Sequence, residues 1–353
     1  MSKFRLEFKL KQHTPIIHFQ SDQSGATLRA TELKPKLDRF LLENVEGIPF
    51  KENTNGSKSL DYKVKIEADL SHSKEIDARN PLFFGNMGTG EAKKFKEHSK
   101  AFKIEFFSFS SAVLISIKDN FEAFLANTNF GTRQSKGFGG FYIEGKAFDK
   151  SLIEHKVYSF NSTQKDWQED IKFFYAFLRA GINTAKFRGI YAKAVIFSYA
   201  KSKNITWDKK AIKNFYLDNN QNIENEKLMR DLFGLSSSQS WMSYKATITK
   251  EDVEKKIDRF KSPITFKPIV EGKGMRIYFW ADKSVEDILN REFLVNFERK
   301  KGLKLKTPAI FDFDEFFEFA FALDLSKHID SEYHNNGQYT KLVRMFKEIK
   351  ESK

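Results

Sequence analysis

The order of the hydrophobic patterns in the first 150 residues constrains the fold more than any other feature of this chain. Residues 4–10 alternate between apolar and charged side chains, which is the period of a half-buried strand, and residues 31–43 have the spacing of an amphipathic helix. Further alternating segments predict strands at 60–70, 102–109 and 112–117. A short helix is expected at 120–126, and residues 141–143 open a last strand. Apart from the additional strand segment at 112–117, this order is β-α-β-β-α-β. It predicts a ferredoxin-like, or RRM-like, domain, whose sheet commonly binds RNA on one face.

The second half of the chain predicts another mixed α+β domain. Strand patterns recur at 244–249, 264–269 and 275–280. Helical patterns fall at 167–178, 189–201, 285–299, 314–323 and 339–350, and one or two shorter helices are expected within 209–234. We therefore expect an α+β fold of two ferredoxin-like domains, at 1–150 and 151–353, the second with a helical insertion at about 165–238. The segment 45–100 exceeds a normal connection and predicts an inserted hairpin with a flexible part near Gly85–Gly90.

Glycines, cations and aromatic residues are interleaved just before the last strand of the first domain. The segment is Gly131-Thr-Arg133-Gln-Ser-Lys136-Gly137-Phe138-Gly139-Gly140-Phe141-Tyr142. Its glycines allow the backbone to approach a ligand closely, while its cations and rings suit a phosphate backbone with stackable bases. The alternative is a tight loop before a strand, with Phe141 and Ile143 in the core. The segment follows a helix and opens a strand, which is the reverse of a dinucleotide-binding motif.

A second basic segment begins at Gly25 and leads into the first helix. Its cations are Arg29, Lys34, Lys36 and Arg39. A helix N-terminus can receive an anion, so these residues are candidates for contact with RNA. The alternative is a solvated basic face on an ordinary helix.

The composition favours a polyanionic partner and excludes several kinds of site. The 353 residues include 60 Lys and Arg against 47 Asp and Glu, a net charge of +13 that favours nucleic acid, although basic proteins without such a partner exist. The chain has no cysteine, which excludes disulfides and thiolate chemistry and fits the cytoplasm. No apolar run is long enough to span a membrane. Most of the 38 phenylalanines must be core residues, and a few are candidates for base stacking.

Candidates for catalysis are sparse in this sequence. The seven histidines show no metal-binding pattern, and we expect no metal and no cofactor. His13 or His18 is a candidate general base beside bound RNA, although a histidine at a strand end is commoner. The acidic Asp312-Phe-Asp314-Glu315 resembles a magnesium-binding pair, but its spacing favours a capping box before a helix.

Three short motifs together resemble a known family. They are the run Thr14-Pro15-Ile-Ile-His18 with Leu28-Arg29-Ala-Thr-Glu-Leu-Lys34-Pro-Lys36-Leu, the glycine-rich loop 131–140, and Arg259-Phe-Lys-Ser262-Pro263-Ile-Thr-Phe. These motifs resemble those of the RAMP superfamily, the ferredoxin-like RNA-binding proteins of CRISPR effector complexes. The likeness is closest to the first subunit of the type III-B, or Cmr, complex. One departure is His18-Phe-Gln-Ser-Asp, which replaces the usual glycine-rich segment after Thr-Pro.

The resemblance implies a non-catalytic subunit that works in antiviral defence beside other CRISPR effector subunits. It would hold guide RNA and the guide–target RNA duplex, with Arg133, Lys136, Gly137, Gly139 and Gly140 at the phosphates and Arg29 and Lys34 near the RNA path. One alternative is a metal-independent endoribonuclease that processes precursor RNA through a histidine such as His18 or His13, or cleaves target RNA through Asp69 or Asp77 on the inserted hairpin. A further alternative is a protein-interaction module that docks through the Phe-rich segment 310–323.

Overall fold

The chain falls into two compact units that exchange one segment. A computed structural model describes residues 4–16, 27–54, 56–77, 94–217, 226–235, 237–241, 245–298 and 300–352. The first unit contains residues 1–81, 88–157 and 266–278, and the second contains 82–87, 158–265 and 279–353. Each unit mixes helices and sheets, so the predicted α+β class is confirmed.

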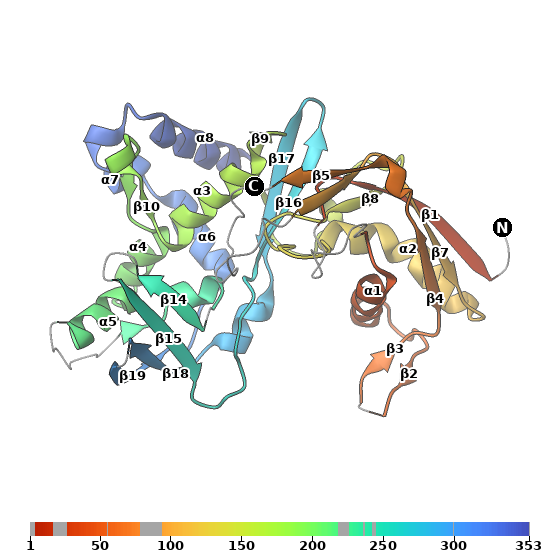
Figure 1. Ribbon diagram of the computed structural model, residues 1–353, viewed down its shortest axis with the longest axis horizontal. Helices are drawn as coiled ribbons and strands as arrows, with labels where there is room; N and C mark the ends of the chain where they lie inside the picture. Colours follow the sequence, from red (N-terminus) through yellow and green to blue (C-terminus); the bar gives the residue numbers. More distant parts are fainter. Residues whose placement is uncertain are drawn as a thin grey trace. The chain divides into compact units, whose positions relative to one another are not determined.

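A four-stranded sheet forms the centre of the first unit, in the order β4-β7-β1-β8. Its strands are β1 (Arg5–Gln12), β4 (Lys63–Glu67), β7 (Phe102–Phe107) and β8 (Phe141–Ile143), and neighbouring strands are antiparallel. Helices α1 (Ala30–Asn44) and α2 (Ser111–Asn127) lie on the same face of this sheet (Figure 1). Apolar residues of both helices and of β1 and β7 form one core, while the opposite face of the sheet carries alternating charged side chains.

The segment predicted as a strand at 112–117 is the first half of α2, so that prediction is wrong. The side chain of Ser110 caps the helix by accepting a hydrogen bond from the backbone N–H of Val113. Val113, Ile117 and Phe121 are buried at helical spacing and pack into the core. The β-branched residues imitate a strand locally, and burial against the sheet selects the helix.

The long connection between α1 and β7 contains two hairpins in addition to β4. The first joins β2 (Lys51–Glu52) to β3 (Lys58–Ser59), and the second pairs β5 (Ser73–Asp77) with β6 (Lys94–His98). The expected inserted hairpin is therefore present. The predicted flexible part near Gly85–Gly90 lies outside the described residues.

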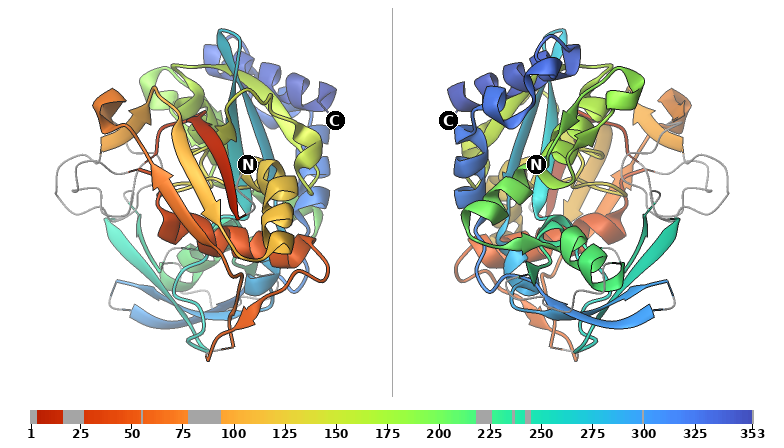
Figure 2. Two further views of the ribbon diagram at one scale, coloured as in Figure 1. Left: turned by 90° about the vertical axis from the view of Figure 1, so that its right-hand side faces the viewer. Right: turned by 90° about the vertical axis from the view of Figure 1, so that its left-hand side faces the viewer.

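A six-stranded sheet, in the order β12-β13-β19-β18-β15-β14, is the largest sheet of the second unit. Its strands are β12 (Thr206–Trp207), β13 (Glu226–Lys227), β14 (Ser238–Trp241), β15 (Ala246–Asp252), β18 (Glu292–Phe297) and β19 (Lys300–Lys306). Figure 2 shows β18 and β19 side by side, as their antiparallel register requires. A short two-stranded ribbon, β10 (Ile182–Asn183) with β11 (Tyr191–Ala192), lies elsewhere in this unit.

A three-stranded sheet has the order β16-β17-β9. Its strands are β9 (Tyr158–Thr163), β16 (Ile264–Glu271) and β17 (Gly274–Ala281). The segment exchanged between the units, residues 266–278, comprises most of β16 and β17 with the turn between them. Residues from the second half of the sequence thereby contact the glycine-rich loop and the end of α2 in the first unit.

The helices of the second unit follow the predicted positions, with two corrections. They are α3 (Trp167–Arg179), α4 (Val195–Ser202), α5 (Asp208–Tyr216), α6 (Phe313–Ala322), α7 (Leu325–His328) and α8 (Gly337–Glu351). The predicted helix at 189–201 begins only at Val195, because β11 precedes it. The predicted helix at 285–299 is wrong: a 3-10 turn ends at Ile288, Asn290 takes a left-handed φ of 54°, and β18 follows.

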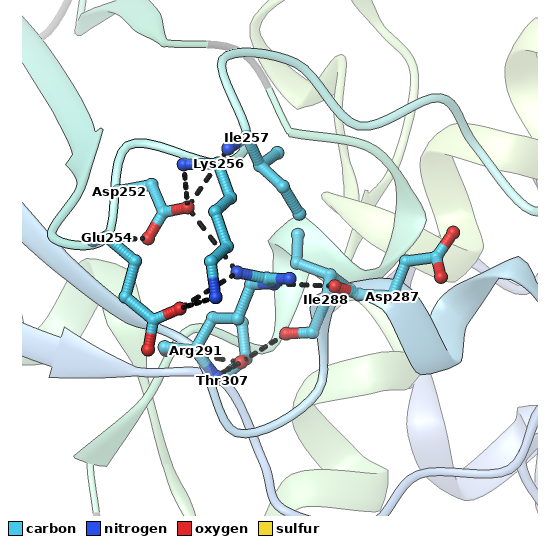
Figure 3. Close-up of polar contacts among 8 residues, drawn as sticks. All are labelled: Asp252, Glu254, Lys256, Ile257, Asp287, Ile288, Arg291 and Thr307. Carbon is cyan, nitrogen blue, oxygen red and sulfur yellow. Dashed lines mark hydrogen bonds and ion pairs between the residues drawn. The ribbon is translucent and has the colours of Figure 1, made fainter. Parts of the chain in front are cut away.

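A polar cluster fixes the long connection between β15 and β16 (Figure 3). The buried carboxylate of Asp252 accepts hydrogen bonds from the backbone N–H groups of Glu254, Lys256 and Ile257 at 3.0–3.1 Å. The guanidinium of Arg291 lies 3.5 Å from the same carboxylate and donates to the carbonyl of Asp287 at 2.6 Å. The chain that leads to the Ser262-Pro263 motif is thus held at its start by one carboxylate.

Candidate nucleic-acid interface

The glycine-rich loop lies between α2 and β8 and is held against the end of β1. The N–H of Gly139 donates to the carbonyl of Pro15 at 2.8 Å, and the N–H of Gly140 donates to the hydroxyl of Thr14 at 2.9 Å. The N–H of Gly137 donates to Gln134 within the loop at 3.2 Å. These amides are therefore engaged inside the protein, and the Thr14-Pro15 motif and the loop form one structural unit.

Gly139 cannot carry a side chain in this loop. Its φ is +73°, and a Cβ at this position would overlap the carbonyl oxygen of Phe130. The close approach allows the N–H of Phe130 to donate to the carbonyl of Gly139 at 2.9 Å. Phe138, next to it, is completely buried. A base cannot stack on a ring without accessible surface, so Phe138 is a packing residue in this structure.

The exchanged segment closes the other side of the glycine-rich loop. The N–H of Phe266 donates to the carbonyl of Ser135 at 3.1 Å, and the amide of Asn129 donates to the carbonyls of Gln134 and Phe266 at 2.7 and 3.0 Å. The Nζ of Lys136 lies 5.7 Å from the centre of the Phe266 ring, and this lysine is only 6% exposed. Residues from both halves of the sequence therefore shape the loop.

Lys36 connects helix α1 to this loop. Its ammonium donates to the carboxylate of Glu32 at 2.7 Å, the carbonyl of Asn129 at 3.0 Å and the side-chain oxygen of Gln134 at 2.8 Å. An ammonium group has three N–H donors, so all three are used. The same oxygen of Glu32 accepts from the N–H of Gly131 at 2.8 Å. Burial lowers the pKa of Lys36, and the neighbouring Glu32 opposes that shift.

Lys34 has a similar local role on the same helix. Its ammonium lies 3.2 and 2.9 Å from the two carboxylate oxygens of Asp38 and 2.8 Å from the carbonyl of Leu60. It also lies 3.8 Å from the centre of the Tyr62 ring. Lys34 thereby ties α1 to the segment before β4.

Three further arginines lie on the loop and on α1, and each guanidinium nitrogen of Arg133 has less than 1 Å² of accessible surface. Arg133 has a left-handed φ of 62°, and burial lowers the pKa of its guanidinium to about 9, so it stays charged at neutral pH. Arg29 occupies the N-cap position of α1 without a capping hydrogen bond from its side chain, and Arg39 is exposed on the same helix. The predicted RNA-binding cations thus fall into two groups. Lys34 and Lys36 hold α1 in place through the contacts described above, whereas these arginines and Lys136 are not part of those contacts.

A lysine that the sequence did not single out lies beneath the loop. Lys267 is 1% exposed, and its ammonium donates to the carbonyls of Leu125 and Thr128 at 2.6 and 2.8 Å, at the end of α2. Burial and the charge of Lys36 lower its pKa to about 7. His13 stacks on Tyr142 with 4.1 Å between ring centres. Burial and the nearby Lys267 lower the pKa of His13 to about 3, so this histidine is neutral at pH 7.

Two family models match the chain in succession. The model of the Cmr1 N-terminal domain matches residues 3–182, and that of the Cmr1 C-terminal domain matches residues 191–351. The chain belongs to the Cmr1 family. The resemblance to the first subunit of Cmr complexes is therefore confirmed. No curated protein matches the sequence.

Two solved structures resemble this Cmr1-family chain. One is Cmr1 from Pyrococcus furiosus in its apo form, with 12% identity and a TM-score of 0.40, covering 79% of this chain and 89% of that one. The other is a type III-B Cmr-beta complex bound to cognate target RNA and AMPPnP in the presence of single-stranded DNA, with 13% identity and a TM-score of 0.36, covering 79% and 94%. Because both TM-scores are low, the family assignment rests on the two domain models.

The structure describes only part of the candidate catalytic set. His18 lies outside the described residues, as does the side chain of Asp77, and His13 is covered by the loop. Asp69 is exposed and caps a 3-10 turn, with His72 and Lys100 at 3.0 and 3.1 Å from its carboxylate. Hydrogen bonds from Ser71 and Lys100 hold the pKa of Asp69 below its usual range, which makes this carboxylate a weak base.

The acidic and Phe-rich segments near the C-terminus have structural roles. Asp312 caps α6 by accepting from the N–H groups of Asp314 and Glu315, at 2.6 and 3.2 Å, so the predicted cap is confirmed. Phe316, Phe317 and others on α6 are buried in the core rather than displayed for docking. Within the described residues, no acidic or histidine cluster suits a metal ion, and no helix is long and apolar enough to cross a membrane.

Proposed function

We propose that this Cmr1-family chain is a non-catalytic RNA-binding subunit of a type III-B effector complex. It would hold guide RNA and the guide–target duplex through their backbones rather than by reading bases. Proteins recognise A-form RNA duplexes mostly in this way, by shape and by backbone contacts. The family assignment supports the membership of a Cmr complex. The related Cmr-beta complex is bound to target RNA, which supports RNA as the partner.

The observation that carries the proposal is the gathering of cations around the glycine-rich loop. Lys36 and Lys267 lie under it, and Arg133 and Lys136 belong to it. The summed positive potential of these four groups favours a polyanion along the loop. The phosphates of RNA have this charge.

We assign different roles to the predicted RNA-binding residues. Lys34 and Lys36 position α1 and the loop, because protein acceptors already occupy their ammonium groups. Gly137, Gly139 and Gly140 shape the loop, because their amides donate within the protein. Arg29 and Arg39 are the side chains that would contact phosphates, while the buried charges of Arg133 and Lys136 add positive potential from below.

We also propose that both halves of the chain derive from ferredoxin-like domains, divided near residue 150. In the first unit, the strand order β8-β1-β7-β4 and the two helices on one face support this assignment. In the second half, β9, α3, β16 and β17 follow the same sequence of elements, and the order β9-β17-β16 is that of the first three such strands. The segment from α3 to β13 would be the helical insertion.

Analysis of the RNA that co-purifies with the protein provides a test of this function. We expect the full chain, purified at low salt from its native cells, to carry small RNAs of uniform length that share a repeat-derived segment. The amount should fall steeply as salt is raised, because each neutralised phosphate releases counterions. Recovery of no RNA, or of random cellular RNA without the shared segment, would contradict the proposed role.

The same preparation separates binding from cleavage. We expect added repeat or target RNA to stay intact in the presence of a chelator. Discrete products that form in chelator and disappear in Asp69→Asn or His13→Gln would instead favour the metal-independent ribonuclease.

A further inference from the structure

Phe109 is displayed to solvent on a turn that is held firmly in place. Its side chain is 79% exposed. On one side, buried Ser108 donates its hydroxyl to the carbonyl of Asp61 at 2.6 Å and its N–H to the carbonyl of Phe4 at 3.2 Å. On the other side, Ser110 donates its N–H to the Ser108 hydroxyl at 3.0 Å and caps α2. The exposure of Phe109 is therefore built into the backbone rather than a result of a loose loop.

Two further rings contact Phe109 and extend the apolar surface. The ring centres of Phe4 and Phe107 lie 5.6 and 5.1 Å from that of Phe109, both in edge-to-face geometry. Phe4 is 38% exposed, and Phe107 is partly exposed at the end of β7. We call these three phenylalanines the aromatic patch. Exposed clusters of large apolar rings mark binding surfaces more often than scattered single residues do.

Cations flank the aromatic patch on both neighbouring strands. Phe107 pairs with Arg5 on β1 and with Lys63 on β4 in the sheet register, so all three side chains lie on the sheet face opposite the helices. Arg5 is exposed and has an ion pair with Glu105 at 3.4 Å. Asp61, which precedes β4, pairs with Lys51. Each of these two carboxylates is thus matched by a cation.

We propose that the aromatic patch, with Arg5 and Lys63, is a stacking site for unpaired bases of RNA. This inference rests on the proposed function, since it adds a second contact for the same ligand. Phenylalanine rings stack on bases of any sequence, and flanking cations hold the adjacent phosphates. Phe107 lies on the open sheet face beside the start of β1, whereas the loop lies beyond the other end of β1, where Gly139 and Gly140 contact Pro15 and Thr14.

RNA fits this surface better than another protein does because of the charges beside the rings. The register places a cation on each side of Phe107, and the chain as a whole carries a net charge of +13. Both features attract a polyanion over long range. An uncharged or basic protein surface would gain nothing from them.

Binding of short oligouridine and of a matched RNA duplex by the full chain tests the proposal. We expect Phe109→Ala to weaken oligouridine binding about tenfold and to leave duplex binding unchanged, because only unpaired bases stack on a ring. Phe109→Trp should retain or strengthen the binding. The control is Phe187→Ala, which removes an equally exposed ring, 84% accessible, in the second unit and should have no effect.

Photocrosslinking provides the second measurement. RNA that contains 5-iodouridine should crosslink to the tryptic peptide 104–118, which contains Phe107 and Phe109. Equal oligouridine affinity in Phe109→Ala and the wild-type protein would overturn the stacking site, while the wild-type affinity itself would still support the proposed function. A loss of binding to another Cmr subunit without any change in RNA affinity would also overturn it and would identify the patch as a protein-docking surface.

Discussion

At the residue scale, Lys267 is the most unusual charged group of the first unit. It is buried, its ammonium caps the end of α2 through two carbonyls, and it lies close enough to Lys36 for the two charges to interact. Its position beneath the glycine-rich loop means that its protonation sets part of the positive potential there.

The lowered pKa of Lys267 predicts a pH dependence of stability. The pKa is about 7 in the folded protein and about 10.5 in the unfolded chain, so the unfolded chain holds more protons between these values. The contribution of Lys267 to the free energy of unfolding therefore rises with pH across this window, by at most about 1.4 kcal/mol per pH unit. We expect urea unfolding of Lys267→Met to lack this rise between about pH 7 and about pH 9. Equal pH slopes in the two proteins would mean that Lys267 titrates near its usual pKa.

At the scale of an element, the glycine-rich loop depends on backbone contacts that a side chain would break. Gly139 is pressed against Phe130 and hydrogen-bonded to Pro15, so the loop, the end of β1 and the start of β8 are one structure. The sequence located this loop and its position between a helix and a strand. The sequence does not show whether the glycine amides are open to a ligand or hydrogen-bonded inside the protein. That difference depends on the contacts with Thr14 and Pro15.

Gly139→Ala should therefore destabilise the protein far more than an ordinary glycine substitution. We expect a loss of at least about 3 kcal/mol in the free energy of unfolding, from the left-handed φ together with the steric overlap. Gly47→Ala is the matched control, since its φ of +69° is similar but no atom lies within 4 Å of the added Cβ. That control should lose only about 1 kcal/mol. Similar losses in the two variants by urea unfolding would contradict the close packing at Gly139.

Other elements show where local patterns were sufficient and where they were not. The first strand and α3 were predicted from their periodicity, because each has one buried face. The sequence pattern predicts a strand at the start of α2 and a helix over β18, because apolar residues in both segments are dense enough to fit either period. Burial against the sheet and the cap at Ser110 select the helix in α2, and the left-handed Asn290 precedes the strand β18.

At the scale of the whole molecule, the candidate interface is assembled from distant parts of the sequence. Its loop comes from the first half, whereas Phe266 and Lys267 arrive on the exchanged segment. The cations on the loop and on α1 belong to motifs that are visible in the sequence. The roles of Lys267, Asn129 and Glu32 are not, because they arise from tertiary contacts between segments that have no pattern in common. The exposure of Phe109 cannot be inferred from the sequence either, where it is an apolar residue at the end of a predicted strand.

The central claim is that the cations around the glycine-rich loop hold RNA phosphates, and the salt dependence of RNA binding by Arg39→Gln tests it most directly. Arg39 is exposed on α1, and its charge acts on Lys36 beside the loop. Arg344→Gln is the matched control, because Arg344 is an exposed arginine on α8 in the second unit. Loss of one phosphate contact should reduce the slope of log affinity against log salt by about 0.7–0.9. We predict this reduction in Arg39→Gln and an unchanged slope in Arg344→Gln. Identical slopes in both variants and the wild-type protein would contradict the account.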